Sequence, residues 1–339
     1  MGEANDTPSD EIIGWLLEEE NPSVRHLALT KLLRRPESDA EVMRAKKRIM
    51  EEGIVPRVLA LRNDEGYWGT KGEFYTDKYR GSVWQLLILA ELGADGADPA
   101  IREACEYLLA SSQDREGMGF SAYERAKGGG GLPSYVIPCL TGNMVFSMLH
   151  FGLGEDARIQ AAVEWICEYQ RFDDGDSEPP RGEPYDRYSM CWGRHSCHMG
   201  VVKSMKALSA IPPRARSEKA RTALAAGAEY LLAHHIFKKS HDLSSISKPG
   251  WLKFGFPLMY QTDVLEILGI LAELGVSDAR MSEAVQVVRE ARDRDGRWSM
   301  RNSYNGKTLV DVEKKGKPSK WITLRALRAL RACASFGAK

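Results

Sequence analysis

The stretch Asn63-Asp64-Glu65-Gly66-Tyr67-Trp68 decides the fold, because it is the first copy of a turn that recurs along the chain. An acidic segment runs into a glycine and then an aromatic residue, and this order returns at residues 114–120 and 293–298. A fourth turn, at residues 170–175, keeps the acidic part but has no aromatic residue after its glycine. The four glycines are 51, 58 and 121 residues apart, the last step being twice a period near sixty. Such a period predicts a repeat architecture.

A second series of positions has the same period. Apolar segments open downstream of the turns, around Gly81, Gly142, Gly200, Asp263 and Thr323, at steps of 61, 58, 63 and 60 residues. Two independent markers with one period indicate a repeat fold more specifically than either marker alone.

The residues between the markers have the period of amphipathic helices. Apolar side chains at 101, 104, 105, 108 and 109 fall on one helical face, and the segments 159–166 and 281–288 repeat the pattern. Asp98-Pro99 and Ser277-Asp278 are suitable helix starts, through a side-chain cap and a fixed φ. Alternation of β-branched residues is almost absent, so we expect no significant sheet.

Each repeat therefore predicts an amphipathic outer helix, a long glycine-containing loop and a more apolar inner helix. About six such hairpins close a ring, and we expect an all-α protein with an α/α toroid in one compact domain. Residues 1–38 are expected to form an irregular N-terminal helical pair (11–20 and 23–35), and residues 39–339 the toroid. The alternative is that Asn21-Pro22-Ser23-Val24-Arg25 opens a HEAT-like hairpin and the solenoid stays open.

Composition narrows the classes of partner and compartment. The chain has 339 residues, with 47 Lys+Arg against 47 Asp+Glu, so its overall charge attracts neither nucleic acid nor an anionic membrane. No segment approaches the ~18 apolar residues of a spanning helix. The N-terminus is polar and acidic, unlike a secretory signal, and the six cysteines do not form a disulfide framework. We expect a cytoplasmic protein.

The densest group of chemistry-bearing residues is Cys191-Trp192-Gly193-Arg194-His195-Ser196-Cys197-His198, which enters the third inner helix. A helix N-terminus lowers a thiol pKa, and thiolate with imidazole suits tetrahedral Zn²⁺. Cys139 stands at the corresponding place one repeat earlier, and a closed ring would bring it close. We therefore predict Zn²⁺ as the cofactor, held by Cys139, Cys191, His195 and Cys197. The alternative is that these residues only pack the helix start.

Two further residues are candidates for moving protons. Asp263 takes a marker position at the start of an apolar helix, where burial would raise its pKa; it could also be a simple N-terminal charge. His235 belongs to the pair His234-His235 at the end of an outer helix. The acidic run at residues 173–176 occupies a turn position and is expected to be structural.

Aromatic residues near the inner-helix starts are candidates for binding a planar, apolar or cationic ligand. Those selected are Trp84, Trp192, Trp251 and Trp321. The alternative is that they pack between the hairpins.

These paired helices with acidic-glycine-aromatic turns resemble the squalene/oxidosqualene cyclase and protein prenyltransferase β-subunit superfamily, over residues of about 40–335. The resemblance implies inner helices around a deep, aromatic-lined cavity that holds an isoprenoid, with reactive groups near inner-helix N-termini. His195-Ser196-Cys197 before Gly200 is similar to the zinc-binding run of the prenyltransferases, and His195 is carried over as a ligand. The family's Asp-x-Cys pair has no counterpart, since Asp186 lies five residues before Cys191, and the cyclase Asp-x-Asp-Asp is absent.

Three functions follow as hypotheses. The first, which we favour, is a prenyltransferase- or terpenoid-cyclase-like enzyme, a transferase, cyclase or lyase that uses a metal on an apolar, isoprenoid-like substrate in a central cavity. The second is a cofactor-free cyclase or isomerase with Asp263 as the acid. The third is a non-catalytic module that binds a lipid or a peptide. None of them involves nucleic acid or a membrane-spanning segment.

Overall fold

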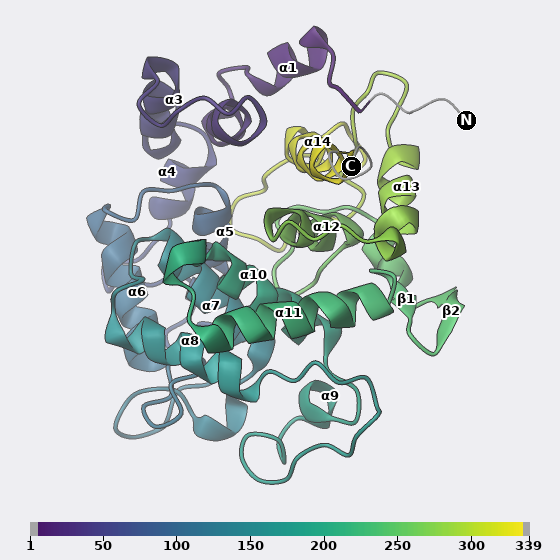
Figure 1. Cartoon of the computed structure of the whole chain (residues 1–339). Helices are drawn as coiled ribbons and strands as arrows, with labels where there is room; N and C mark the ends of the chain where they lie inside the picture. The colour runs from purple at the N-terminus through teal and green to yellow at the C-terminus, as the bar shows by residue number, and fades with distance from the viewer. Residues whose placement is uncertain (1–5, 335–339) are drawn as a thin grey trace.

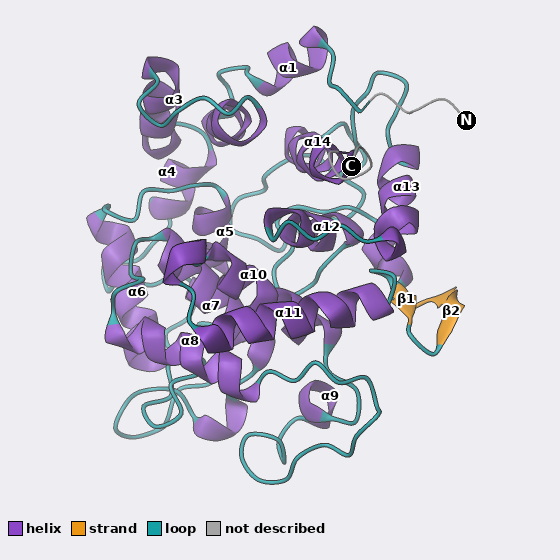
Figure 2. Ribbon diagram, in the orientation of Figure 1, coloured by secondary structure: helices purple, strands orange, loops and turns teal. Residues whose placement is uncertain are grey.

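The computed structural model describes residues 6–334 and is all-α (Figures 1 and 2). The inner helices are α5 (Ser82–Glu91), α7 (Pro138–His150), α10 (His198–Ala210), α12 (Val264–Glu273) and α14 (Lys320–Ala334). The outer helices are α6 (Pro99–Ser111), α8 (Ala157–Tyr169), α11 (Glu218–Ala233) and α13 (Ser282–Glu290). The N-terminal helices are α1 (Asp10–Leu16), α2 (Pro22–Leu27), the π-helical turn η1 (Ala28–Leu32), α3 (Ala40–Glu51) and α4 (Ile54–Leu59).

The remaining elements lie in the loops. They are the helix α9 (Ser189–Trp192), four short 3₁₀ turns at Pro133–Tyr135, Pro213–Ala215, Pro249–Leu252 and Ala279–Met281, and the antiparallel pair β1 (Lys238–Lys239) and β2 (Asp242–Ile246). This pair is the whole of the sheet within residues 6–334. None of the helices in that range combines the length and the apolar character needed to cross a membrane.

The inner helices pack side by side in chain order and form a closed ring. Helix α5 packs on α7, α7 on α10, α10 on α12 and α12 on α14. The C-terminal helix α14 then packs on α2 and η1, while α4 packs on α5. An ion pair of 2.5 Å between Arg325 of α14 and Glu91 of α5 spans the seam. The chain is therefore an α/α toroid, and the HEAT-like open solenoid is not the form it adopts.

The two sequence markers are joined by a repeated hydrogen bond. Three marker turns contain the aromatic residues Trp68, Phe120 and Trp298. The backbone N–H group of each donates a hydrogen bond of 3.0 Å to a hydroxyl at the next inner-helix start. The acceptors are Ser82, Thr141 and Thr323. In the fourth repeat the carboxylate of Asp263 takes this place and accepts from Gly255 N–H at 3.0 Å. The common period thus reflects one anchor between loop and helix, with the buried N–H groups satisfied.

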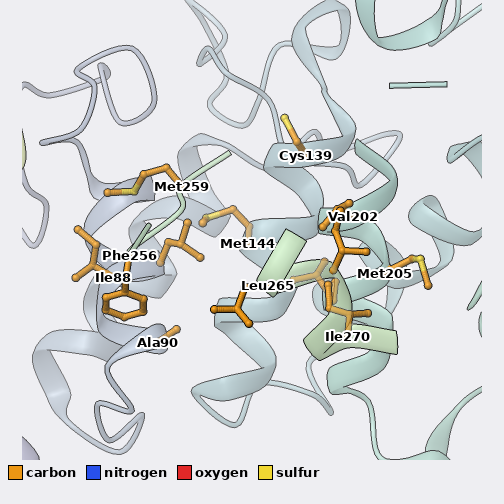
Figure 3. Close-up of a cluster of buried hydrophobic side chains, with 14 of the residues drawn as sticks. Ile88, Ala90, Cys139, Met144, Val202, Met205, Phe256, Met259, Leu265 and Ile270 are labelled. Atoms are coloured by element: carbon orange, nitrogen blue, oxygen red, sulfur yellow. The ribbon is translucent and has the colours of Figure 1, made fainter. Parts of the chain in front are cut away.

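Burial separates inner from outer helices as the sequence predicts. In α5 every residue from Ser82 to Ala90 is buried, whereas outer helix α13 buries one stripe that contains Ala284, Val285 and Val288. Inner-helix and loop side chains such as Met144, Met205, Met259 and Leu265 fill the space between the helices (Figure 3).

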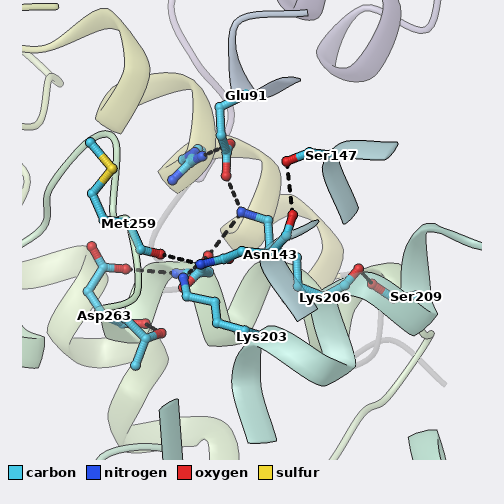
Figure 4. Close-up of polar contacts among 11 residues, drawn as sticks. Glu91, Asn143, Ser147, Lys203, Lys206, Ser209, Met259 and Asp263 are labelled. Atoms are coloured by element: carbon cyan, nitrogen blue, oxygen red, sulfur yellow. Dashed lines mark hydrogen bonds and ion pairs between the residues drawn. The ribbon is translucent and has the colours of Figure 1, made fainter. Parts of the chain in front are cut away.

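Charged side chains occupy the axis of the ring (Figure 4). Lys203 Nζ lies 2.7 and 2.8 Å from the carboxylate oxygens of Glu266, and the side chains of both residues are at most 5% exposed. Lys206 pairs with Glu266 at 3.1 Å and also with Glu91, which in turn binds Arg325. Residues from α5, α10, α12 and α14 therefore meet in one buried network.

This network lies between two cavities at opposite ends of the ring. Along α10, Cys197, His198 and Met199 line the first cavity, while Lys206, Ser209 and Ala210 line the second; Lys203 lines neither. Helix α7 repeats the order, with Cys139 at the first cavity and Phe146 at the second. The resemblance implied one deep, aromatic-lined cavity with reactive groups near inner-helix N-termini. The first cavity lies at these N-termini and is lined by tyrosines, and the buried ion pairs separate it from the second cavity.

Element boundaries differ from the expected ones mainly at the N-terminus. Helix α1 ends at Leu16 rather than at residue 20, and the second helix changes into the π-helical turn at Ala28. Asp278 caps a 3₁₀ turn, so α13 begins only at Ser282. The outer ends of the predicted domains, residues 1–5 and 335–339, lie outside the described residues.

Candidate functional site

The candidate site is the first cavity, which we call the thiol cavity because Cys139, Cys191 and Cys197 all line it. Its volume is about 750 Å³, within the ~300–1,000 Å³ range typical of small-molecule sites. It lies at the N-terminal ends of α7 and α10, under the loops that precede them. His195 lines it as well, so all four predicted zinc ligands face the same space although up to 58 residues separate them in sequence.

Cys197 is the N-cap residue of α10 and lines the thiol cavity. A hydrogen bond from the Cys191 thiol is the largest cause that lowers its pKa to about 6. Burial opposes this shift, while the backbone N–H groups of Met199 and Gly200 and the positive charge of Lys248 add to it. The pKa of Cys197 is therefore lower than that of an ordinary cysteine, which favours the thiolate, the nucleophilic form of cysteine.

The other two thiols of the cavity stay protonated. Donation of its hydrogen bond to Cys197 is the main cause that raises the pKa of Cys191, and burial adds to the effect. Burial raises the pKa of Cys139, the second residue of α7, to about 12. The cavity thus holds one thiol with a lowered pKa beside two thiols with raised pKa values.

Histidines and an aspartate form the adjoining wall. Asp174 lies between two imidazoles, with its Oδ1 3.3 Å from His195 Nδ1 and 3.3 Å from His234 Nε2. His234 is buried, and its Nδ1 lies 2.8 Å from the carbonyl oxygen of Tyr230. The Asp174 carboxylate therefore orients His234 in the wall of the cavity.

His198 has a buried nitrogen without a partner. It is 9% exposed, lines the cavity and packs against Trp251, with ring centroids 4.4 Å apart. Burial is the main cause that lowers its pKa well below the ordinary value, so the ring is neutral at pH 7. Its Nε2 has no hydrogen-bond partner among the described residues. An unpaired buried imidazole nitrogen beside a cavity is available to a ligand.

The predicted zinc site does not have the geometry of a zinc centre. Cys191 and Cys197 are free thiols that interact with each other through a hydrogen bond. His195 instead faces Asp174, and the His195 side chain is 59% exposed. No group of three or more His, Cys, Asp or Glu within residues 6–334 is arranged to hold a metal ion. The Zn²⁺ assignment therefore gains no support, and no chemical step below passes through a metal.

The two predicted proton-transfer residues do not line the cavity. Asp263 is buried at the N-cap of α12, and its two oxygens accept from Glu266 N–H at 2.8 Å and Gly255 N–H at 3.0 Å. Burial is the main cause that raises its pKa to about 6. His235 faces the outer surface, with Nδ1 3.7 Å from Glu283 of α13. Its neighbour His234 faces the cavity instead.

The four tryptophans are buried packing residues. Trp84 packs among Tyr75, Tyr79 and Tyr260, and Trp192 contacts Trp165 and Tyr185. Trp251 stands behind His198, one layer from the thiol cavity. Trp321 stacks on Phe256 at 4.1 Å and lines the second cavity. Their part in substrate binding stays a prediction.

Other residues that line the thiol cavity were not expected from the sequence. They are tyrosines and lysines, namely Tyr75, Lys78, Tyr188, Lys248 and Tyr260 from the loops and Tyr230 from outer helix α11. Lys78 Nζ lies 4.6 Å from the ring centre of Tyr260 and 4.9 Å from that of Tyr75. The five loop residues share one sequence signal, which is a position in the loops that precede inner helices.

Comparison with known proteins gives similarity of shape at low identity. No protein-family model and no curated protein sequence matches the chain significantly. Among solved structures, a protein from Actinoplanes is 13% identical at a TM-score of 0.43, with 92% of this chain and 90% of that one covered. The type II terpene cyclase MstE from Scytonema is also 13% identical at a TM-score of 0.43, with coverages of 94% and 89%.

A variant of MstE in complex with geranylgeranyl dihydroxybenzoate, its substrate, is 16% identical at a TM-score of 0.34, with coverages of 86% and 98%. Similarity at this level identifies neither a family nor a reaction for this chain.

Proposed function

We propose that the chain is an enzyme that acts on a small organic molecule in the thiol cavity, with Cys197 as the nucleophile. The observation that carries the proposal is the position of Cys197 at the start of α10, where a thiol whose pKa is lowered by the neighbouring Cys191 thiol faces a cavity of about 750 Å³. Reactive cysteines occur at such helix N-termini, whereas structural buried cysteines stay protonated. Cys139 and Cys191, in the same cavity, are of the protonated kind.

The remaining wall defines the class of substrate. Tyrosine rings offer flat apolar surface with polar edges. Lys78, Lys239 and Lys248 add positive charge, against the single carboxylate of Asp174 in the same wall. The substrate is therefore a molecule with a flat or hydrocarbon body and an anionic group. An isoprenoid body, as the sequence resemblance implies, belongs to this class.

The chemistry is group transfer through a covalent intermediate. The sulfur of Cys197 forms a bond to an electrophilic carbon of the substrate, and the bond from that carbon to the leaving group breaks, with its electron pair going to the leaving group. An acceptor nucleophile, or water, then attacks the same carbon and releases the thiolate. His198 lines the same wall, and its Nε2, which has no partner among the described residues, is placed to take the proton of that acceptor. The cycle needs no oxidant or reductant.

Two other functions remain as competing outcomes. In an Asp263-dependent cyclase the carboxyl group would have to reach the substrate, yet both of its oxygens are used by backbone N–H groups outside the cavity wall. A non-catalytic binding module would use the same cavity without consuming its ligand.

The test compares the wild-type protein with Cys197→Ser and, as a matched control, Cys333→Ser, a partly exposed thiol that does not line the thiol cavity. Each protein is incubated with fractionated small-molecule extract from the source cells, and both depletion of compounds and covalent adducts on the protein are followed by mass spectrometry. We expect the wild type and Cys333→Ser to deplete the same anionic compound, and Cys197→Ser to leave it intact. Equal depletion by all three proteins, or ligand binding without depletion, would overturn the proposal.

A further inference from the structure

The second cavity lies at the other end of the ring and has no part in the proposed reaction. It is lined by residues of the inner helices α5, α7, α10, α12 and α14 together with η1, and its volume is about 430 Å³. This also falls within the ~300–1,000 Å³ range of small-molecule sites. Much of its wall is apolar, with Leu32, Phe146, Leu265, Ile270 and Leu324. We call it the cationic cavity because basic residues outnumber acidic ones in its wall.

Positive charge exceeds negative charge around this cavity. The basic residues that line it are Lys31, Arg34, Lys206, Arg325, Arg328 and Arg331, whereas its carboxylates are Glu91, Glu266 and Glu273. All three carboxylates already have partners, because Glu91 and Glu266 belong to the axial network and Glu273 pairs with Arg328 at 2.7 Å.

The surplus lies at the rim. Arg331 Nη1 donates to the carbonyl oxygen of Leu32 at 2.7 Å, which is the usual role of a cation at a helix C-terminus. Lys31 and Arg34 are exposed, and neither forms an ion pair with a carboxylate among the described residues. The side chains of Lys31 and Arg34 are thus two positive charges without a carboxylate partner in the described part of the chain, at the rim of the apolar cavity.

An aromatic ring extends the apolar wall toward the inside of the ring of helices. Trp321 is 1% exposed and lines the cavity. Its ring stacks on Phe256, with ring centroids 4.1 Å apart.

We propose that the cationic cavity binds a single-chain amphiphilic anion, of the class of medium-chain carboxylates. The hydrocarbon chain lies against the leucines, Phe146 and Trp321, and the carboxylate lies at the rim beside Lys31 and Arg34. A single hydrocarbon chain is required because the buried ion pairs of Lys203 and Lys206 with Glu91 and Glu266 close the inner end of the cavity. This site is separate from the thiol cavity, so it stands or falls independently of the proposed reaction.

The probe is decanoate, titrated into the full chain by isothermal calorimetry, with decanol and acetate as probes that lack the charge or the chain. We expect decanoate to bind with one site per chain. Decanol and acetate should bind at least about tenfold more weakly, because decanol lacks a charge-assisted hydrogen bond and acetate lacks the apolar chain. Equal binding of decanol would remove the role of the cations. Absence of decanoate binding would overturn the proposal.

Two variants locate the site. Gly269 of α12 lines the cavity, and a Cβ added there meets no atom within 4 Å, so Gly269→Leu fills the hollow without a backbone clash. Leucine also favours the helix more than glycine does, so the variant should fold. Its matched control is Gly14→Leu in α1, where a Cβ is equally free. We expect Gly269→Leu to abolish decanoate binding and Gly14→Leu to leave it unchanged; equal binding to both would overturn the proposal.

The rim is tested by the double variant Lys31→Gln/Arg34→Gln, which should weaken decanoate binding about tenfold or more. Lys314→Gln/Lys315→Gln removes two exposed charges outside the cavity and should change it less than about twofold. Alkylation of Cys197 by iodoacetamide should leave decanoate binding intact. If alkylation abolished it, decanoate would occupy the thiol cavity and the proposal would be wrong.

Discussion

The low pKa of Cys197 should depend on one neighbouring thiol. The hydrogen bond from Cys191 is the largest cause of its shift from 9.0 to about 6. A hydrogen bond to a charged acceptor is worth about 1.5–3 kcal/mol, and one pKa unit corresponds to about 1.4 kcal/mol. Cys191→Ala should therefore raise the pKa of Cys197 by about one to two units, while the α10 amides and Lys248 keep it below 9.0.

The assay is the rate of carbamidomethylation by iodoacetamide, measured at each cysteine by peptide mass spectrometry between pH 5 and pH 10. The midpoint of the pH profile is the quantity to compare, because a thiolate of lower pKa is also intrinsically less nucleophilic, which blurs absolute rates. The wild-type midpoint for Cys197 should lie near pH 6, and Cys191→Ala should move it upward by about one to two units. Cys191→Ser keeps a donor and should move it less.

The matched control is Cys167→Ala. Cys167 lies on outer helix α8 away from the thiol cavity, and burial raises its pKa to about 11. This variant should leave the Cys197 profile unchanged. A wild-type midpoint near that of an ordinary thiol would refute the reasoning, and so would a Cys191→Ala profile identical to that of the wild type.

Three further predictions concern the buried charges and the metal. Glu266→Gln leaves Lys203 buried without its partner and should lower the free energy of unfolding by about 3–5 kcal/mol in urea titrations, whereas Glu273→Gln, on an exposed pair, should cost less than about 1 kcal/mol; equal losses would contradict this. The pKa of Asp263 is raised to about 6, so its stabilising contribution is complete below its unfolded value and is lost as the pH rises through 6. Asp263→Asn keeps one acceptor oxygen but turns an amide NH2 toward the second backbone N–H, so it should lower the free energy of unfolding by about 1–3 kcal/mol. Because asparagine does not titrate, this loss should shrink as the pH rises from about 4.5 to 7, with turnover retained; loss of turnover in a folded variant would favour the cyclase hypothesis. Dialysis against EDTA should leave the thermal midpoint and the Cys197 alkylation profile unchanged, and stoichiometric zinc lost on Cys197→Ser, measured by elemental analysis, would reinstate the zinc site.

The repeat could be predicted from the sequence because the hydrogen bond that joins each loop to its inner helix lies within a single repeat. A hydroxyl at Ser82, Thr141 and Thr323 accepts from the aromatic turn of its own repeat, so both partners carry the same period. The meeting of the cysteines also follows from the period, because consecutive inner helices start at the same end of a ring. Both depend on chemistry that each repeat contains within itself.

The axial ion pairs and the histidine wall could not be predicted in this way. Lys203 and Glu266 are 63 residues apart and lie inside apolar helices, and nothing local identifies which charges face one another. The choice between His234 and His235 turned on where α11 stops. The helix continues to Ala233, so His234 keeps the inward direction, while His235 takes a left-handed backbone conformation and turns outward.

The position of the axial network has a consequence for how the ring works. Buried ion pairs contribute little net stability but penalise arrangements that leave a charge unpaired. Here the charges come from α5, α10, α12 and α14, so a ring that failed to close between α14 and α5 would leave Glu91 without Arg325. The network therefore selects the closed ring over the open one, at the point where chain connectivity does not enforce closure. The network also separates the two cavities. Binding of a ligand in one cavity therefore affects the other cavity only through the packing of these four helices.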